Sequence, residues 1–134
     1  MNRERALTIT WTLLRVVAAL MFVQVGGLKL FGWFGGMPGA NGAPPPVLSQ
    51  VWIGAVLEVV GGILIALGLF TRPAAFILSG EMAVAYWQFH APKGTWPIEN
   101  HGEQAVLYCF LFLFMAAYGA GAWSLDAVIR KKRM

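Results

Sequence analysis

Four apolar segments, each long enough to cross a bilayer, make up most of this chain. A hydrocarbon core of roughly 30 Å takes about 20 helical residues. The segments that reach this length are approximately residues 10–31, 47–70, 73–91 and 101–122. Because the stretches between them are too short for a soluble domain, the pattern predicts one all-α integral membrane domain over residues 1–134. Its expected architecture is a bundle of four transmembrane helices.

Within each segment, polar or small residues recur every three or four positions, which places them along one face of a helix. We expect these faces to point into the bundle, because lipid disfavours polar groups and small residues let helices approach closely. The expected inward faces are Arg15, Ala19, Phe22, Gly26 and Lys29; Gly54, Glu58, Gly61, Ile65, Gly68 and Arg72; Ile77, Glu81, Val84 and Gln88; and Glu103, Phe110, Phe114, Ala117 and Gly121.

Composition and charge agree with a membrane protein and suggest a topology. Hydrophobic residues make up 58% of the chain and charged residues 12%, and the net charge is +4. The basic residues lie at segment ends, as membrane topology requires, and do not form a face suited to binding phosphates. If the helices alternate, most of them share one side: Arg3, Arg5, Arg72 and residues 130–133. The positive-inside rule then predicts that both termini are cytoplasmic.

Some other readings of the chain are disfavoured. The first apolar run is longer than the 7 to 15 residues of a secretory signal core, so we expect an uncleaved first helix. The single cysteine, Cys109, cannot form a disulfide within the chain. Arg15, Arg72 and Asp126 fall at the expected cytoplasmic edge, where we expect mostly structural roles.

Glu58 and Glu81 lie near the centres of two apolar segments. A carboxylate at bilayer depth is costly and by default marks a site. Either the two glutamates pair across helices and fix the packing, or they handle protons or bind a ligand as catalytic groups. We expect at least one to be protonated at neutral pH, since desolvation and a neighbouring like charge both favour the neutral acid. A neutral acid can donate a hydrogen bond to a carbonyl compound such as a quinone, or to other ligands.

Further polar residues fall in the outward half of the segments and predict an outward-facing polar cavity. The candidate ligand-binding residues there are Lys29, Gln24, Gln88, His90, His101 and Glu103. The spacing of the two histidines matches no strong metal-ligand motif, so no metal site is predicted. An alternative for this region is structural, with Asn100 as the N-cap of the fourth helix and Glu103 completing a capping box.

Four separated motifs occur in combination along the chain. They are Arg15, Phe22, Gly26, Lys29 and Leu30; Glu58, Gly61, Gly62, Leu67, Gly68, Leu69, Thr71, Arg72, Ala74 and Ala75; Met82, Ala83, Val84, Ala85, Tyr86 and His90; and Asn100, Gly102, Glu103, Gly119, Gly121, Ser124, Leu125 and Asp126. Together they resemble the DoxX family of small four-helix bacterial membrane proteins over nearly the whole chain. Two positions depart from the family pattern. Ala19 stands where members usually have Gly, and His101 interrupts an Asn-Gly-Gly-Glu stretch.

The resemblance implies a multi-pass protein of the bacterial inner membrane but leaves several functions open. The family takes its name from a subunit associated with thiosulfate:quinone oxidoreductase, and other relatives are linked to membrane redox complexes. The first expectation is therefore a quinone-binding subunit that depends on a redox partner protein. In it, Glu58 and Glu81 relay protons while Lys29 and His90 orient the ligand.

Two further functions are compatible with the same residues. Distant eukaryotic relatives of the family look like assembly chaperones or cargo receptors, so the chain could be a non-catalytic binding protein. A small proton-coupled transporter is the third alternative, for which four helices would usually need a homodimer to form a path.

Overall fold

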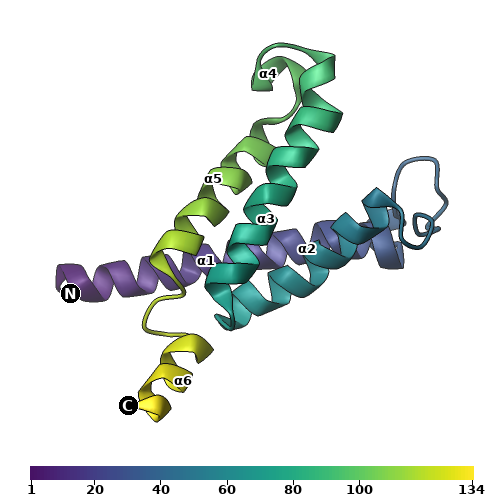
Figure 1. Ribbon diagram of the computed structural model, residues 1–134. Coiled ribbons are helices and arrows are strands. Elements are labelled where there is room, and N and C mark those ends of the chain that lie inside the picture. Colours follow the sequence, from purple (N-terminus) through teal and green to yellow (C-terminus); the bar gives the residue numbers. More distant parts are fainter. The chain divides into compact units, whose positions relative to one another are not determined.

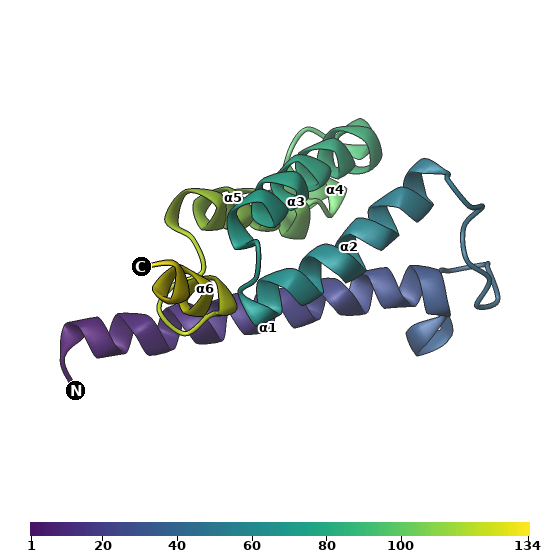
Figure 2. The same cartoon turned by 60° about the horizontal axis from the view of Figure 1, so that its bottom comes forward.

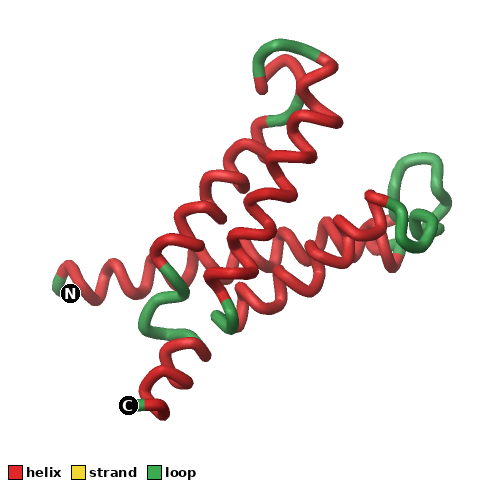
Figure 3. The backbone as a smooth tube through the Cα atoms, in the orientation of Figure 1, coloured by secondary structure: helices red, strands yellow, loops and turns green.

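The computed structural model describes all 134 residues, and every regular element in it is helical (Figure 3). The chain divides into two compact units, Met1–Phe70 with Ala120–Met134, and Thr71–Gly119. Two helices, α1 (Arg3–Phe31) and α2 (Gln50–Leu67), are long and apolar enough to cross a membrane. A third apolar helix, α5 (Glu103–Tyr118), is shorter.

Helices α1 and α2 form an antiparallel hairpin in the first unit (Figures 1 and 2). The carboxamide oxygen of Asn2 accepts a hydrogen bond from the Arg5 amide, so α1 begins well before its apolar stretch. Gly32 ends α1 and Gly68 ends α2, both in the left-handed conformation that glycine adopts without strain. Ser49 caps the start of α2 through a hydrogen bond from the Trp52 amide.

Glycines let the two helices of this hairpin approach closely. A β carbon on Gly26 would lie 2.7 Å from both the Ala55 carbonyl oxygen and the Val59 side chain. One on Gly62 would lie 2.6 Å from the Val23 side chain. Most residues of the expected inward faces of these two helices are buried, but Gly54 and Lys29 are half-buried, and Arg72 is exposed and belongs to the helix that begins at Thr71. The buried members of the two faces are Arg15, Ala19, Phe22, Gly26, Glu58, Gly61, Ile65 and Gly68.

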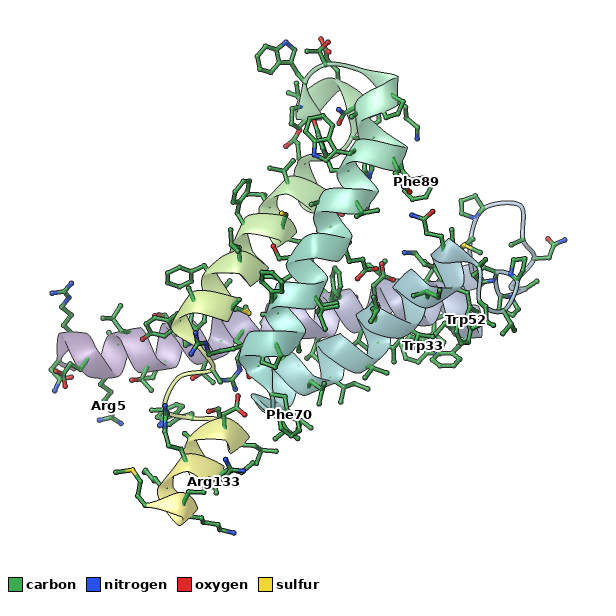
Figure 4. All side chains as sticks on the ribbon, viewed as in Figure 1. Arg5, Trp33, Trp52, Phe70, Phe89 and Arg133 are labelled. Atoms are coloured by element: carbon green, nitrogen blue, oxygen red, sulfur yellow. The ribbon has the colours of Figure 1, made fainter.

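Residues 32–49 connect α1 to α2 and contain the short 3-10 helix η1 (Trp33–Gly35). The indole of Trp33 packs directly on Gly27, leaving no room for a side chain there. Trp33 and Trp52 both lie at the loop end of the hairpin (Figure 4). This connection is mostly irregular, as its glycine and proline content predicts.

The C-terminal segment returns to the first unit and ends in α6 (Leu125–Arg133). The buried guanidinium of Arg15 donates hydrogen bonds to the carbonyl oxygens of Ala120 and Trp123. The Asp126 amide donates to the Gly68 carbonyl at 2.8 Å, and the Asp126 carboxylate accepts from the Phe70 amide at 2.8 Å. These contacts fasten the segment to the hairpin. The apolar pattern did not predict α6, because this helix is short and strongly charged.

The second unit is a hairpin of α3 (Thr71–Ala85) and α5, which lie side by side in both ribbon views (Figures 1 and 2). A π-helical turn, η2 (Tyr86–His90), continues α3 without interruption. The short helices η3 (Ala91–Lys93) and α4 (Pro97–Asn100) then lead into α5.

Two side chains link α3 to the backbone of α5. The Ser79 hydroxyl donates to the Cys109 carbonyl at 2.7 Å, and Arg72 Nε donates to the Ala116 carbonyl at 2.8 Å. Both acceptors are helical carbonyl oxygens, so the α3–α5 contact depends on main-chain groups as well as on packing.

The expected inward faces of the second unit are not the faces that pack together within this hairpin. The buried residues of the α3–α5 hairpin are Thr71, Ala75, Leu78, Ser79 and Met82 on α3, and Ala105, Phe112 and Met115 on α5. The predicted residues that are instead exposed are Ile77, Val84, Gln88, Glu103, Phe110, Phe114 and Ala117. The polar residues Glu81, Gln88 and Glu103 marked the predicted faces, whereas the two helices contact each other mainly through apolar and small residues.

Candidate functional site

An ion pair lies inside the first hairpin. Lys29, in the last turn of α1, and Glu58, in the middle of α2, approach to 2.7 Å between Nζ and Oε1. The Glu58 side chain is 2% exposed and that of Lys29 is 25% exposed. The carboxylate is therefore enclosed, while the ammonium group remains partly accessible.

The glycine packing of the hairpin explains why these two side chains meet. Gly26 precedes Lys29 by three residues and lies on the same helical face. A β carbon at Gly26 would lie 3.0 Å from the Glu58 β carbon. Because no side chain intervenes, α2 comes close enough for Lys29 to reach across to Glu58. The register of the hairpin thus depends on a residue next to the ion pair.

Chemically, the pair combines a shielded anion with an accessible cation. An ammonium group has three N–H donors and no acceptor. Lys29 directs one donor at Glu58, and its exposed part can donate to another acceptor, such as a carbonyl or carboxylate oxygen. In apolar surroundings such charge-assisted hydrogen bonds are stronger than in water. The arrangement is suited to holding a small acceptor-bearing molecule against the hairpin.

The remaining predicted residue of this hairpin, Gln24, is exposed. It precedes Lys29 by five residues, which places it about 140° away around the helix. The structure therefore does not bring Gln24 to the ion pair.

A second polar cluster surrounds Asn100 in the other unit. The Asn100 side chain is fully buried and donates to the Gly94 carbonyl at 3.0 Å and to the Tyr86 hydroxyl at 3.2 Å. Its carboxamide oxygen accepts from the Gly102 amide at 2.9 Å. These hydrogen bonds connect Asn100 to Tyr86, the first residue of η2, and to Gly94, in the segment between η2 and α5.

The imidazole ring of His90 joins this cluster by contacting the backbone of Asn100. Its Nδ1 lies 3.1 Å from the Asn100 carbonyl oxygen, and since a carbonyl only accepts, Nδ1 must carry the proton. The imidazole stacks on Tyr86 with ring centroids 6.4 Å apart. In the neutral ring, Nε2 is then an acceptor.

The other predicted residues of this unit do not converge on His90. Gln88, His101 and Glu103 are exposed, and His101 adopts a left-handed conformation at the end of α4. No three His, Cys, Asp or Glu side chains come together anywhere in the chain. The predicted capping role of Asn100 is also wrong, because Gly102 occupies the N-cap of α5 and Asn100 bonds to its amide.

The two central glutamates belong to different units of the structure. Glu58 lies in the first unit and Glu81 in the second, where it is half-buried on α3. Glu58 forms the ion pair with Lys29 described above.

The side-chain contacts of Tyr86, Asn100 and Ser79 were not predicted from the sequence. The four-residue spacing of Tyr86 and His90 indicates that they share a helical face, and this was the available signal for the stacking. No comparable signal marked Ser79, whose partner is a backbone carbonyl.

Comparison with known proteins identifies the family. The family model for DoxX matches residues 10–91, which include both members of the ion pair. This chain belongs to the DoxX family. The matched range also contains Glu81 and His90, whereas His101 and Glu103 lie beyond it.

Relatives of this DoxX protein cover most of its length. A Haemophilus influenzae protein described as uncharacterized is 50% identical over 89% of this chain and 90% of its own. The Escherichia coli inner membrane protein YphA is 34% identical over 84% of each chain, and YqjF, another inner membrane protein of that bacterium, is 28% identical over 88% of this one. No solved structure matches the chain significantly. The protein is therefore a multi-pass DoxX protein of the bacterial inner membrane.

Proposed function

We propose that this DoxX protein is a membrane subunit of a redox complex, in which the Lys29–Glu58 pair helps to bind a quinone or a similar small carbonyl compound. The proposal rests on one observation, a partly exposed ammonium group held by a buried carboxylate within an apolar hairpin. Intramembrane charged residues are costly and usually functional.

The residues present fit a quinone head group. A quinone carbonyl accepts hydrogen bonds, and the accessible side of Lys29 can donate them. Glu58 holds the ammonium in place and balances its charge, so that the cation is tolerated at this depth. When bound, a quinone supplies two-electron redox chemistry, and its electrons would come from a partner protein.

We further propose that the chain forms one domain of four membrane-spanning helices with both termini cytoplasmic. Helix α3 has 15 residues and η2 adds five without a break, so together they extend about 30 Å. Helix α5 has 16 residues and extends about 24 Å. In the first unit, the N-terminal arginines and the basic residues of α6 lie away from the α1–α2 loop (Figure 1). That charge distribution supports the cytoplasmic assignment.

Quinone retention tests the ligand. The protein would be purified from its native membrane in mild detergent, and quinone per protein would be measured by extraction and mass spectrometry. We expect retention by the wild type and loss in the Lys29→Met/Glu58→Met double variant, which removes both charges together. Gln24→Met, on another face of α1, is the matched control and should retain quinone.

Two results would contradict this function. One is a wild-type preparation without bound quinone that also fails to bind added quinone, and the other is equal retention by the double variant. In the first case, a partner protein recovered with the wild type would favour an assembly role. Proton-coupled flux in proteoliposomes would favour a transporter.

A further inference from the structure

The last helix, α6, has one face against the protein and an opposite apolar face that is exposed. Ala127 is 6% exposed and packs on the rest of the first unit. By contrast, Leu125, Val128 and Ile129 are 42%, 48% and 37% exposed. At about 100° per residue, these three share a face centred about 150° from Ala127. This apolar face of α6 thus points away from the hairpin.

Cations flank the apolar face of α6. The last turn contains the consecutive basic residues Arg130, Lys131, Lys132 and Arg133, all exposed. The helical period places the two arginines on one side of the apolar face, Lys131 on the other, and Lys132 in line with the face, one turn beyond Val128. The one acidic residue, Asp126, directs its carboxylate at the Phe70 amide. Apolar and cationic surfaces are therefore adjacent and exposed on the same short helix.

We propose that α6 is an interfacial anchor that binds the anionic phospholipid headgroups of the membrane in which the protein is embedded. In this arrangement Leu125, Val128 and Ile129 enter the boundary between headgroups and acyl chains, and the cations contact lipid phosphates. If α6 lay in water, its apolar face would stay hydrated. If it lay on a neutral bilayer, its cations would have no anionic partner. An anionic interface accommodates both surfaces at once.

The attachment of α6 to the hairpin supports this proposal. Arg15 holds the carbonyls of Ala120 and Trp123, and Asp126 bonds to the backbone where α2 ends. Ser124 caps the helix through a hydrogen bond from the Ala127 amide. Its neighbour Trp123 is 56% exposed, and tryptophan is enriched at membrane interfaces. Since the helix is already ordered and tethered, lipid binding need not order a free tail.

The position of the basic end is visible in the first unit. Arg133 on α6 and Arg5 on α1 both lie at the end of this unit that carries the chain termini (Figure 4). The N-terminal arginines therefore provide a natural comparison, since they are basic but belong to no exposed amphipathic helix of this kind.

A spin label on the apolar face measures the depth of α6. Full-length protein carrying Ile129→Cys in a Cys109→Ala background would be placed in nanodiscs of phosphatidylcholine alone or mixed with phosphatidylglycerol. Collisions with oxygen report lipid, and collisions with a water-soluble nickel complex report water. We expect the label to lie in lipid only in the anionic discs. High salt should shift it toward water, because salt screens exposed charges.

Neutralising the four cations tests the charge requirement. With Arg130→Gln, Lys131→Gln, Lys132→Gln and Arg133→Gln combined, the label should become water-accessible in anionic discs. Retention of phosphatidylglycerol in native mass spectrometry should also fall, by up to about fivefold per charge. A matched variant that exchanges each arginine for lysine and each lysine for arginine should behave as the wild type. The Arg3→Gln/Arg5→Gln variant should leave the depth at residue 129 unchanged.

Several outcomes would overturn the anchor. The first is equal label depth in neutral and anionic discs, and the second is an unchanged depth after neutralisation or in high salt. A third is a label shielded from both oxygen and nickel, which would mean that protein, from a partner or a second copy, covers this face. The salt titration uses wild-type charges, so it decides the question even if the neutralised variant fails to fold.

Discussion

In the α1–α2 hairpin the helices approach through glycines, whereas in the α3–α5 hairpin larger side chains fill the interface. Gly26 and Gly62 leave no room for a β carbon. Across the second interface, Leu78 and Phe112 are almost completely buried. Close approach places a lysine and a glutamate in contact in the first hairpin, while the second is linked by a serine hydroxyl and backbone carbonyls.

The two hairpins therefore enclose different kinds of polar group, a charged pair in the first and a neutral hydroxyl in the second. Two opposite charges stabilise each other only at short range, so the ion pair needs the approach that Gly26 permits. A neutral hydroxyl needs one acceptor and no counter-charge, and the short side chain of Ser79 finds that acceptor on the main chain of α5. Variants that disturb one hairpin and spare the other can therefore test this contrast.

The largest effect should come from breaking the ion pair. Lys29→Met leaves the enclosed Glu58 carboxylate without its cation and should lower the free energy of unfolding by about 3 to 5 kcal/mol. Adding Glu58→Met should recover most of that loss, since matched apolar replacement of a buried pair is often neutral. Unfolding in mixed detergent micelles measures both. A double variant as unstable as Lys29→Met alone would contradict the pairing.

The next effect concerns the glycines. Gly26→Ala introduces a β carbon against Ala55 and Val59, and overpacking of this kind costs about 1 to 3 kcal/mol. Gly80, on α3, is the matched control because a β carbon there meets nothing within 4 Å. Gly80→Ala should leave stability unchanged or raise it by up to about 1 kcal/mol. The same unfolding titration compares them, and equal losses would refute the contrast between the hairpins.

A substitution at Asn100 should cost about as much stability as Gly26→Ala, but the loss should be confined to the second unit. Asn100→Ala removes three side-chain hydrogen bonds and leaves the Gly102 amide with only the Pro97 carbonyl as acceptor, which should cost about 1 to 3 kcal/mol. Hydrogen exchange should rise in residues 86–103 and stay unchanged in α1 and α2. Asn100→Asp keeps the acceptor and should protect Gly102 more than alanine does. Faster exchange throughout α1 would show that the cluster stabilises more than its own unit.

The smallest effect should come from Ser79. Removing its hydrogen bond to the Cys109 carbonyl with Ser79→Ala should cost about 0.6 kcal/mol, as is typical of hydrogen bonds between membrane helices. Thr10→Ala is a control, because that hydroxyl bonds within its own helix. A loss at Ser79 as large as that of Lys29→Met would mean that the two hairpins depend equally on their polar contacts.

The inward faces of the first hairpin could be predicted because costly residues mark them. Arg15 and Lys29 on α1 and Glu58 on α2 would be unfavourable in lipid, so their helical phase identifies the protein side. On α3, Ile77 and Val84 are as apolar as Leu78 and Met82. Glu81 shares the face of Ile77 and Val84 and marked it as inward, but α5 packs against the face of Leu78 and Met82.

The sequence could indicate which residues are candidates for the site, but it could not indicate which of them contact one another. Lys29 and Glu58 were both candidates, but their pairing depends on the register that the loop of residues 32–49 sets. The spacing of Asn100 and Glu103 suits a capping box, yet Gly102 begins α5 because the Asn100 carboxamide accepts its amide hydrogen bond. Both outcomes depend on contacts that sequence spacing alone does not specify.

The hydrogen bonds from Arg15 also impose an order on biosynthesis. The guanidinium emerges from the ribosome before its two carbonyl acceptors, on Ala120 and Trp123, which follow Arg15 by 105 and 108 residues. The α1–α2 hairpin therefore enters the membrane with a cation that must stay hydrated or temporarily bonded until the C-terminal segment arrives. The first hairpin to be synthesised is the last part of the molecule to be completed.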